Sequence, residues 1–124
     1  MSSVKIMQIG MIGLGRMGLN MVRRLLAGGH EVVAYNRSKE PLEEALKAGA
    51  VAAISLEELI KKLKPPRAVW VMLPAGQITE EKIESVAKLL SANDVIIEGG
   101  NSFYKDDISR ADRLRAKSIH YIDV

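Results

Sequence analysis

A glycine-rich segment, Gly13-Leu14-Gly15-Arg16-Met17-Gly18, constrains this chain more than any other feature of its sequence. It follows an apolar stretch at residues 8–12 that suits a buried strand, and it precedes a helical pattern of apolar residues. In a G-x-G-x-x-G segment the first glycine permits a tight turn and the second lets a pyrophosphate approach the backbone. The third lets the helix pack closely on the strand. The segment therefore predicts a phosphate site at a helix N-terminus, and a glycine-rich turn that binds nothing is the alternative.

Patterns typical of strands and helices alternate along the rest of the chain. We expect strands at residues 8–12, 31–35, 51–54, 68–73, 95–97 and 120–124, with helices between them, the last one at 104–117. Such alternation, with unbroken apolar strands, predicts one α/β domain over residues 1–124, a doubly wound parallel sheet with helices on both faces. Right-handed crossovers favour the strand order 3-2-1-4-5-6, with the ligand across the carboxyl ends of the strands.

Two local patterns predict details of the helices. The helix that begins near Pro41 is expected to bury Leu42, Ala45 and Leu46 and to stop at Gly49. Ser55 and Glu58 have the spacing of a capping box for the next helix. The methionines, among them Met17 and Met21, are expected to fill the core.

Charge and composition exclude several classes of function. The chain has 18 basic and 15 acidic residues in an interspersed pattern, which does not favour nucleic acid as a partner. It has no cysteine, so we expect no disulfide and no thiolate metal site, and a reducing, cytoplasmic compartment. Its two histidines, His30 and His120, are too far apart for a metal-binding spacing, and no metal is expected. No targeting segment or membrane span is visible, so no membrane partner is expected.

The end of the second expected strand bears on the choice of dinucleotide. Enzymes that prefer NAD usually carry an acidic residue there, about 20 positions past the glycines. This chain has Asn36-Arg37-Ser38 instead. Asn36 and Ser38 can hydrogen-bond a 2′-phosphate, and Arg37 can pair with it and stack on the adenine. The segment therefore favours NADP, with NAD still possible, and a solvated turn arginine is the alternative for Arg37.

Four segments together resemble a known family. These are GLGRMG at 13–18, NRS at 36–38, MLPAGQ at 72–77 and EGGNSFYKD at 98–106. They resemble the amino-terminal domain of 6-phosphogluconate dehydrogenase, one branch of the β-hydroxyacid dehydrogenases. The GGNS segment, followed by Tyr104 and an aspartate, favours the phosphogluconate branch, and the resemblance covers the chain from Met7.

The resemblance implies roles for individual residues. Residues 13–18 would hold the pyrophosphate and residues 36–38 the 2′-phosphate of the cofactor. Leu73, Pro74 and Ala75 would line the adenosine and nicotinamide-ribose region. Asn101 would contact both the nicotinamide side and the substrate, although a turn or capping role would also suit it. Pro74 stands where long enzymes of the family often carry lysine, and GLGRMG replaces their GLAVMG, which suggests the shorter bacterial branch.

The resemblance also implies the reaction. A whole enzyme of this family oxidises 6-phospho-D-gluconate at C3 with reduction of NADP and decarboxylates the product to ribulose 5-phosphate, in the pentose phosphate pathway. The catalytic lysine and glutamate, and a helical domain that forms a homo-oligomer, would lie beyond residue 124, so we expect no catalytic residue in this chain. A dehydrogenase of the 3-hydroxyisobutyrate type and a non-catalytic nucleotide-sensing module are the alternatives.

Overall fold

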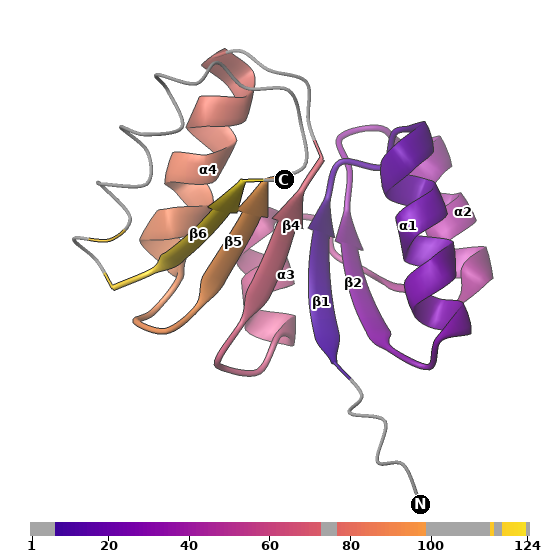
Figure 1. Cartoon of the computed structure of the whole chain (residues 1–124). Coiled ribbons are helices and arrows are strands. Elements are labelled where there is room, and N and C mark those ends of the chain that lie inside the picture. The colour runs from indigo at the N-terminus through magenta and orange to yellow at the C-terminus, as the bar shows by residue number, and fades with distance from the viewer. Residues whose placement is uncertain (1–6, 73–76, 99–114, 116–117, 124) are drawn as a thin grey trace, which may run out of the picture.

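A computed structural model describes residues 7–72, 77–98, 115 and 118–123 of the chain. Its elements, in chain order, are β1 (Gln8–Ile12), α1 (Arg16–Ala27), β2 (Glu31–Tyr35), α2 (Lys39–Ala48), β3 (Val51–Ala52), α3 (Leu56–Lys62), β4 (Ala68–Val71), α4 (Gln77–Leu89), β5 (Val95–Glu98) and β6 (His120–Asp123) (Figure 1). The helix expected at 104–117 lies outside the described residues, apart from Arg115.

The strands form one sheet in the order β3-β2-β1-β4-β5-β6. Every pair of neighbouring strands is parallel, so the expected doubly wound sheet is confirmed. β1 lies between β2 and β4, which places the turn after β1 at the point where the strand order reverses. In sheets of this kind ligands bind at that point, beyond the carboxyl ends of the strands.

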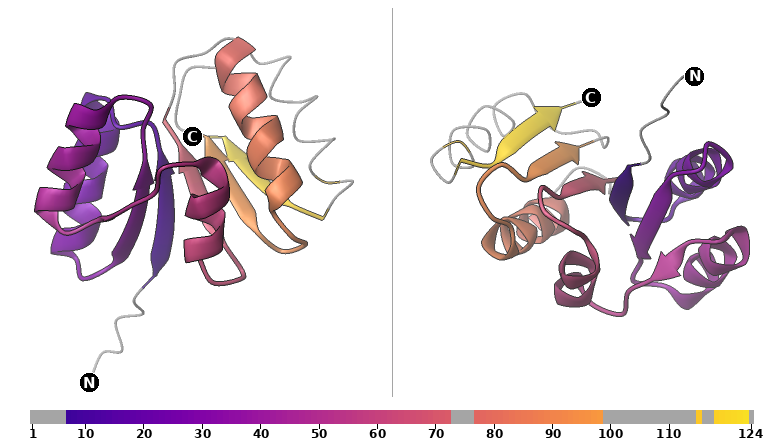
Figure 2. Two further views of the ribbon diagram at one scale, coloured as in Figure 1. Left: turned by 180° about the vertical axis from the view of Figure 1, so that it is seen from behind. Right: turned by 90° about the horizontal axis from the view of Figure 1, so that it is seen from below.

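Two separate cores cover the two faces of the sheet, because successive side chains of a strand point to opposite faces. On one face α1 and α2 pack on Met11, Val32 and Ala34. On the other face the α3 and α4 side chains pack with Ile12 and Val33. Figure 2 shows the two pairs of helices on opposite sides of the sheet. The expected placement of helices on both faces is therefore confirmed.

Strand β3 is shorter than the sequence predicts. It ends at Ala52, and Ile54 is 82% exposed. The reason is local, since the Ile54 N–H donates to Glu58 Oε1 at 3.2 Å and serves the start of α3 instead of the sheet. Ser55 Oγ accepts the Glu58 N–H at 3.1 Å, which is the expected half of the capping box. The hydrogen bond from the Ile54 N–H, and after it the interaction with Lys62, lower the pKa of the Glu58 carboxyl. The ionised carboxylate therefore stabilises the fold, and this stabilisation is lost as pH falls through the folded-state pKa.

The helix α2 buries fewer side chains than expected. Ala45 is fully buried and Leu42 packs beside it, but Leu46 is 48% exposed. Each helical residue is rotated by about 100° from the one before, so Leu46 lies outside the side of α2 on which Ala45 is buried. The helix ends at Gly49 as predicted, with φ of 113°. Within the part of the chain that the structure describes, no helix is long and apolar enough to cross a membrane.

An ion pair with a buried carboxylate, Arg67–Asp94, joins the amino-terminal ends of β4 and β5. Asp94 has no exposed surface, and its carboxylate accepts hydrogen bonds from the backbone N–H groups of Arg67 and Ser91. The Arg67 guanidinium donates to the same carboxylate at 3.1 Å. Both carboxylate oxygens are therefore engaged at the edge of the sheet opposite the ligand edge.

We expect Asp94→Ala to lower the free energy of unfolding by about 3–5 kcal/mol, because it leaves two backbone donors without a partner and removes the counter-charge of the largely buried Arg67, which keeps only its bond to the Ile60 carbonyl. Urea unfolding followed by circular dichroism measures the change. The matched control is Glu44→Ala, which removes the exposed Arg23–Glu44 pair and should cost less than about 1 kcal/mol. Equal losses in the two variants would show that the buried pair contributes nothing special.

Candidate functional site

The turn after β1 has the backbone that its first glycine was expected to allow. Gly13 has φ of 95°, a region that residues with a side chain rarely adopt. Its N–H donates to the carbonyl of Tyr35 at 3.1 Å, which ties the turn to the end of β2. Leu14, next in the chain, is buried beneath the turn at 2% exposure. Leu14 therefore anchors the segment, and its side chain is not available to a ligand.

Gly18 is required by a contact within the segment itself. A Cβ atom on Gly18 would lie 2.2 Å from the carbonyl oxygen of Gly13, far inside any real contact. The same Cβ would lie 3.6 Å from Cβ of Met72, just after β4. The third glycine thus lets the first turn of α1 press against the turn after β1, a closer neighbour than the strand that the sequence analysis named.

Gly15 differs from the other two glycines because the fold does not require it. Its φ and ψ of −67° and −174° are open to any residue, and an added Cβ would meet nothing within 4 Å. Gly15 is the N-cap of α1, where no side chain caps the helix and the first turn has no acidic residue. Gly15, Arg16 and Met17 are all exposed.

The first turn of α1 therefore presents backbone N–H groups and the positive end of a 12-residue helix dipole to open space. A pyrophosphate fits there because it needs hydrogen-bond donors, positive potential and no side chain in its path. The residues present suit the expected dinucleotide.

Asn36 has a structural task that the sequence analysis did not assign to it. Its Oδ1 accepts the Leu14 N–H at 2.9 Å, and its Nδ2 donates to the Ser38 carbonyl at 3.1 Å. The amide thus clips the glycine segment to the turn after β2 and uses both of its ends. The expected contact of this amide with a 2′-phosphate stays a prediction, and the second N–H of Nδ2 is the donor that could make it. Leu14 and Asn36 are 22 positions apart in the sequence, so no local sequence pattern could predict this contact.

Arg37 and Ser38 directly follow Asn36 at the carboxyl end of β2, and both are exposed. Within residues 7–72 and the other described ranges, Arg37 has no ion pair or hydrogen bond. Ser38 is the N-cap of α2, but its side chain makes no capping bond. A cation and a hydroxyl are therefore available at this end of the sheet, where the sequence analysis expected the 2′-phosphate.

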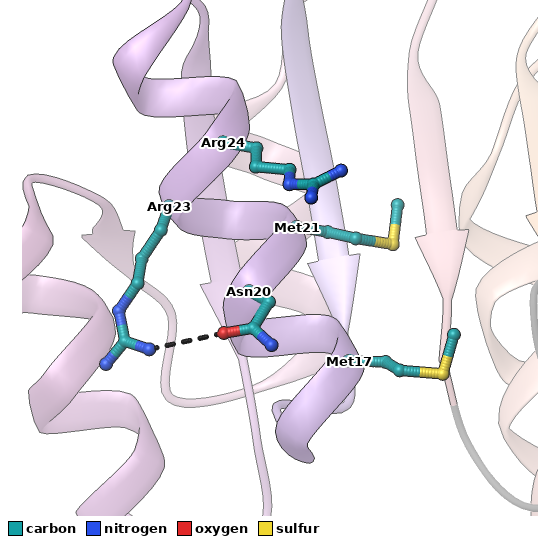
Figure 3. Close-up of a pocket in the computed structure, with 5 residues that line it drawn as sticks. All are labelled: Met17, Asn20, Met21, Arg23 and Arg24. Carbon is teal, nitrogen blue, oxygen red and sulfur yellow. Dashed lines mark hydrogen bonds between the residues drawn. The ribbon is translucent and has the colours of Figure 1, made fainter.

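A hollow of about 530 Å³ lies beside α1, and Figure 3 shows the side chains that line it. It is lined by Met17, Asn20, Met21, Arg23 and Arg24. The expectation that Met17 fills the core is wrong, since Met17 is 68% exposed. It occupies the first turn of α1, where the helix extends past the sheet edge, whereas Met21 one turn later packs against the core as expected.

Four expected site residues, Leu73, Pro74, Ala75 and Asn101, lie outside the described residues. Glu98, the last residue of β5, is 1% exposed and accepts a hydrogen bond from the Tyr121 hydroxyl of β6. The described part of the chain contains no group of three histidine or carboxylate side chains that could hold a metal.

Comparison with known proteins identifies the family. A family model described as the NAD binding domain of 6-phosphogluconate dehydrogenase matches residues 8–124. The NAD(+)-dependent, decarboxylating 6-phosphogluconate dehydrogenase of Haloferax volcanii is 40% identical over 117 residues, which cover 94% of this chain and 38% of that protein. The NADP(+)-dependent enzyme of Bacillus subtilis is 39% identical over 119 residues, which cover 93% of this chain and 25% of that protein.

Solved structures share the fold. The 6-phosphogluconate dehydrogenase of Plasmodium falciparum, described with NADP+ and with 6-phosphogluconate, matches with a TM-score of 0.85 and 33% identity over 92% of this chain and 26% of its own. A 3-hydroxyisobutyrate dehydrogenase of Mycobacterium tuberculosis matches with a TM-score of 0.87 over 96% of this chain and 40% of its own. Its 20% identity shows the fold alone.

The chain spans between 25% and 38% of the length of the two curated relatives described here. The family model, in contrast, covers the chain from the first residue of β1 to its last residue. The glycine turn, the open N-terminus of α1 and the strand order agree with that match. The chain therefore belongs to the family of NAD-binding domains of 6-phosphogluconate dehydrogenase.

Proposed function

We propose that this chain is the NADP-binding domain of a longer 6-phosphogluconate dehydrogenase, which oxidises and decarboxylates 6-phospho-D-gluconate to ribulose 5-phosphate. The observation that carries the proposal is the match of residues 8–124 to the phosphogluconate family. The open N-terminus of α1 at Gly15 supports it, because it offers a site for a pyrophosphate.

The residues of this domain bind and orient the cofactor. The N–H groups at the start of α1 hold the pyrophosphate, while Asn36 keeps the turn fixed against β2. When bound, the dinucleotide would supply the acceptor for the hydride that leaves the substrate. By resemblance to the family, Leu73, Pro74 and Ala75 would line the adenosine and nicotinamide-ribose region, and Asn101 would contact both the nicotinamide and the phosphorylated sugar acid. The catalytic lysine and glutamate belong to a helical domain of the longer protein, which also forms a homo-oligomer in the cytoplasm.

The preference for NADP rests on charge at the end of β2. The two curated relatives differ in their cofactor but are almost equally similar to this chain, so similarity does not decide between NAD and NADP. No carboxylate occurs between Val32 and Lys39 to repel a 2′-phosphate. Arg37 is exposed there and keeps its charge at any working pH.

A β-hydroxyacid dehydrogenase is the second candidate, because the 3-hydroxyisobutyrate enzyme has the same fold and the fold alone does not separate the two reactions. The full-length protein discriminates between the two. We expect it to produce NADPH and carbon dioxide from 6-phosphogluconate and to leave 3-hydroxyisobutyrate unchanged. The 124-residue chain should bind the dinucleotide without turnover. Reversed substrate selectivity would overturn the proposed substrate, and cofactor binding without any dehydrogenase activity would favour a sensing module.

We expect Gly15→Val to weaken NADP and NAD equally, by roughly 100-fold or about 3 kcal/mol, because the side chain would fill the space above the helix N-terminus. Titration calorimetry measures the affinities, and circular dichroism should show an unchanged fold.

Gly18→Ala is the contrasting variant. Its methyl group would meet the Gly13 carbonyl at 2.2 Å, so it should lower the melting temperature as well as binding. Undiminished affinity in Gly15→Val would mean that the glycine segment is only a turn.

We expect Arg37→Ala to weaken NADP by roughly 10- to 150-fold and to leave NAD almost unchanged, because one charge-assisted hydrogen bond contributes about 1.5–3 kcal/mol. The difference should shrink as salt rises, since the site is open to solvent. Dissociation constants of both cofactors test this.

Lys39→Ala is the matched control, because it removes an exposed cation two residues further on and should change neither affinity by much. Asn36→Asp is a poor test of specificity. It places a carboxylate against the Ser38 carbonyl, so it disturbs the turn after β2 and should affect the binding of both cofactors. Equal weakening of NADP and NAD in Arg37→Ala would contradict the assignment.

A further inference from the structure

Lys82 of α4 reaches across to the end of β2. Its Nζ lies over the ring of Tyr35, 5.7 Å from the ring centroid, and its side chain is half-buried. Tyr35 is the last residue of β2, and its carbonyl accepts the Gly13 N–H. Lys82 therefore places a positive charge next to the strand end that precedes Asn36 and Arg37.

The two side chains share a hollow of about 440 Å³ between the start of α3 and α4. Its polar lining includes Ser55, Ser85 and Lys88, and Glu57 is the one carboxylate among the lining residues that the structure describes. Lys82 forms no ion pair with any described residue. Lys82 and Lys88 face one carboxylate, Glu57, among the lining residues that the structure describes, so this lining carries an excess of positive charge.

A cation over an aromatic ring at a partly exposed site is held weakly. A charge-assisted hydrogen bond to a phosphate oxygen is stronger. Lys82 therefore gains by leaving the Tyr35 ring when a phosphate comes within its reach. The lysine ammonium stands on a flexible four-carbon stem and has three donors, so it can change partners by rotation of its own side chain.

We propose that Lys82 is a second cation that reads the 2′-phosphate of NADP, acting from α4 while Arg37 acts from the turn after β2. This inference rests on the proposed function, because it takes the dinucleotide to bind across the carboxyl ends of the strands. Lys82 is a specificity-determining residue in this role. It adds affinity for NADP and none for NAD, which has a hydroxyl at that position.

The test uses two probes that differ only in the 2′-phosphate, adenosine 2′,5′-bisphosphate and adenosine 5′-monophosphate, with titration calorimetry on the 124-residue chain. Lys82→Met removes the charge and keeps an apolar stem over Tyr35. At low salt, we expect it to weaken the binding of the bisphosphate by about 5- to 20-fold and to leave the affinity for the monophosphate unchanged. Lys82→Arg should restore most of the affinity.

Lys88→Met is the matched control. It removes a second lysine from the same hollow, but one that lies about 9 Å further along α4, away from the carboxyl edge of the sheet. We expect it to change the affinity for the bisphosphate by less than twofold.

The outcomes separate this inference from the proposed function. If the parent chain binds both probes equally, the preference for NADP is wrong, and this inference falls with it. If the parent prefers the bisphosphate and Lys82→Met keeps that preference, only the role of Lys82 is wrong. Equal weakening of both probes by Lys82→Met would show that the lysine merely covers Tyr35, which also overturns the inference.

Discussion

The close approach of α1 to the turn after β1 is the constraint on which the rest of the site depends. Gly18 allows it, because any Cβ there would overlap the Gly13 carbonyl oxygen. β4 reaches the same point, since the N–H of Met72 donates to the carbonyl of Ile12 at 2.8 Å. One helix and two strands therefore meet where the strand order reverses, and their meeting fixes the direction in which α1 presents its N-terminus.

Two hydrogen bonds then hold the turn against β2. The Gly13 N–H donates to the Tyr35 carbonyl, and the Leu14 N–H donates to the Asn36 amide. The two phosphate-reading parts of the site, the glycine segment and the turn after β2, are thus one connected unit before any ligand binds. Such preorganisation lowers the ordering cost of binding, which raises affinity without added contacts.

The sequence predicts most of the fold because its signals are local. The spacing of three glycines gives the turn, and unbroken apolar strands between helical patterns give the parallel sheet. The errors in the fold arise where one local signal overrides another. The Ile54 N–H donates to Glu58 and so serves the start of α3 instead of the sheet, and Leu46 is rotated by about 100° from Ala45, which places it outside the buried side of α2.

In the site, separation along the chain decides which features the sequence predicts. The glycines and the exposed Arg37 follow from the motif and its spacing. The engagement of Asn36 by Leu14, and the position of Lys82 over Tyr35, depend on segments 22 and 47 positions apart in the chain. No periodic pattern links residues at such separations, so these contacts become visible only once the sheet is assembled.

The central position of β1 also has a consequence for synthesis of the chain. Residues 8–52 leave the ribosome before β4 and the helices α3 and α4, and they contain the β3-β2-β1 half of the sheet with α1 and α2 on one face. The opposite face of that half, which includes Ile12 and Val33, is covered only when α3 and α4 follow. The second edge of β1 stays unpaired until β4 is added. The nascent chain therefore carries an apolar face and an unpaired strand edge together, the combination that chaperones bind and that leads to aggregation when it stays exposed.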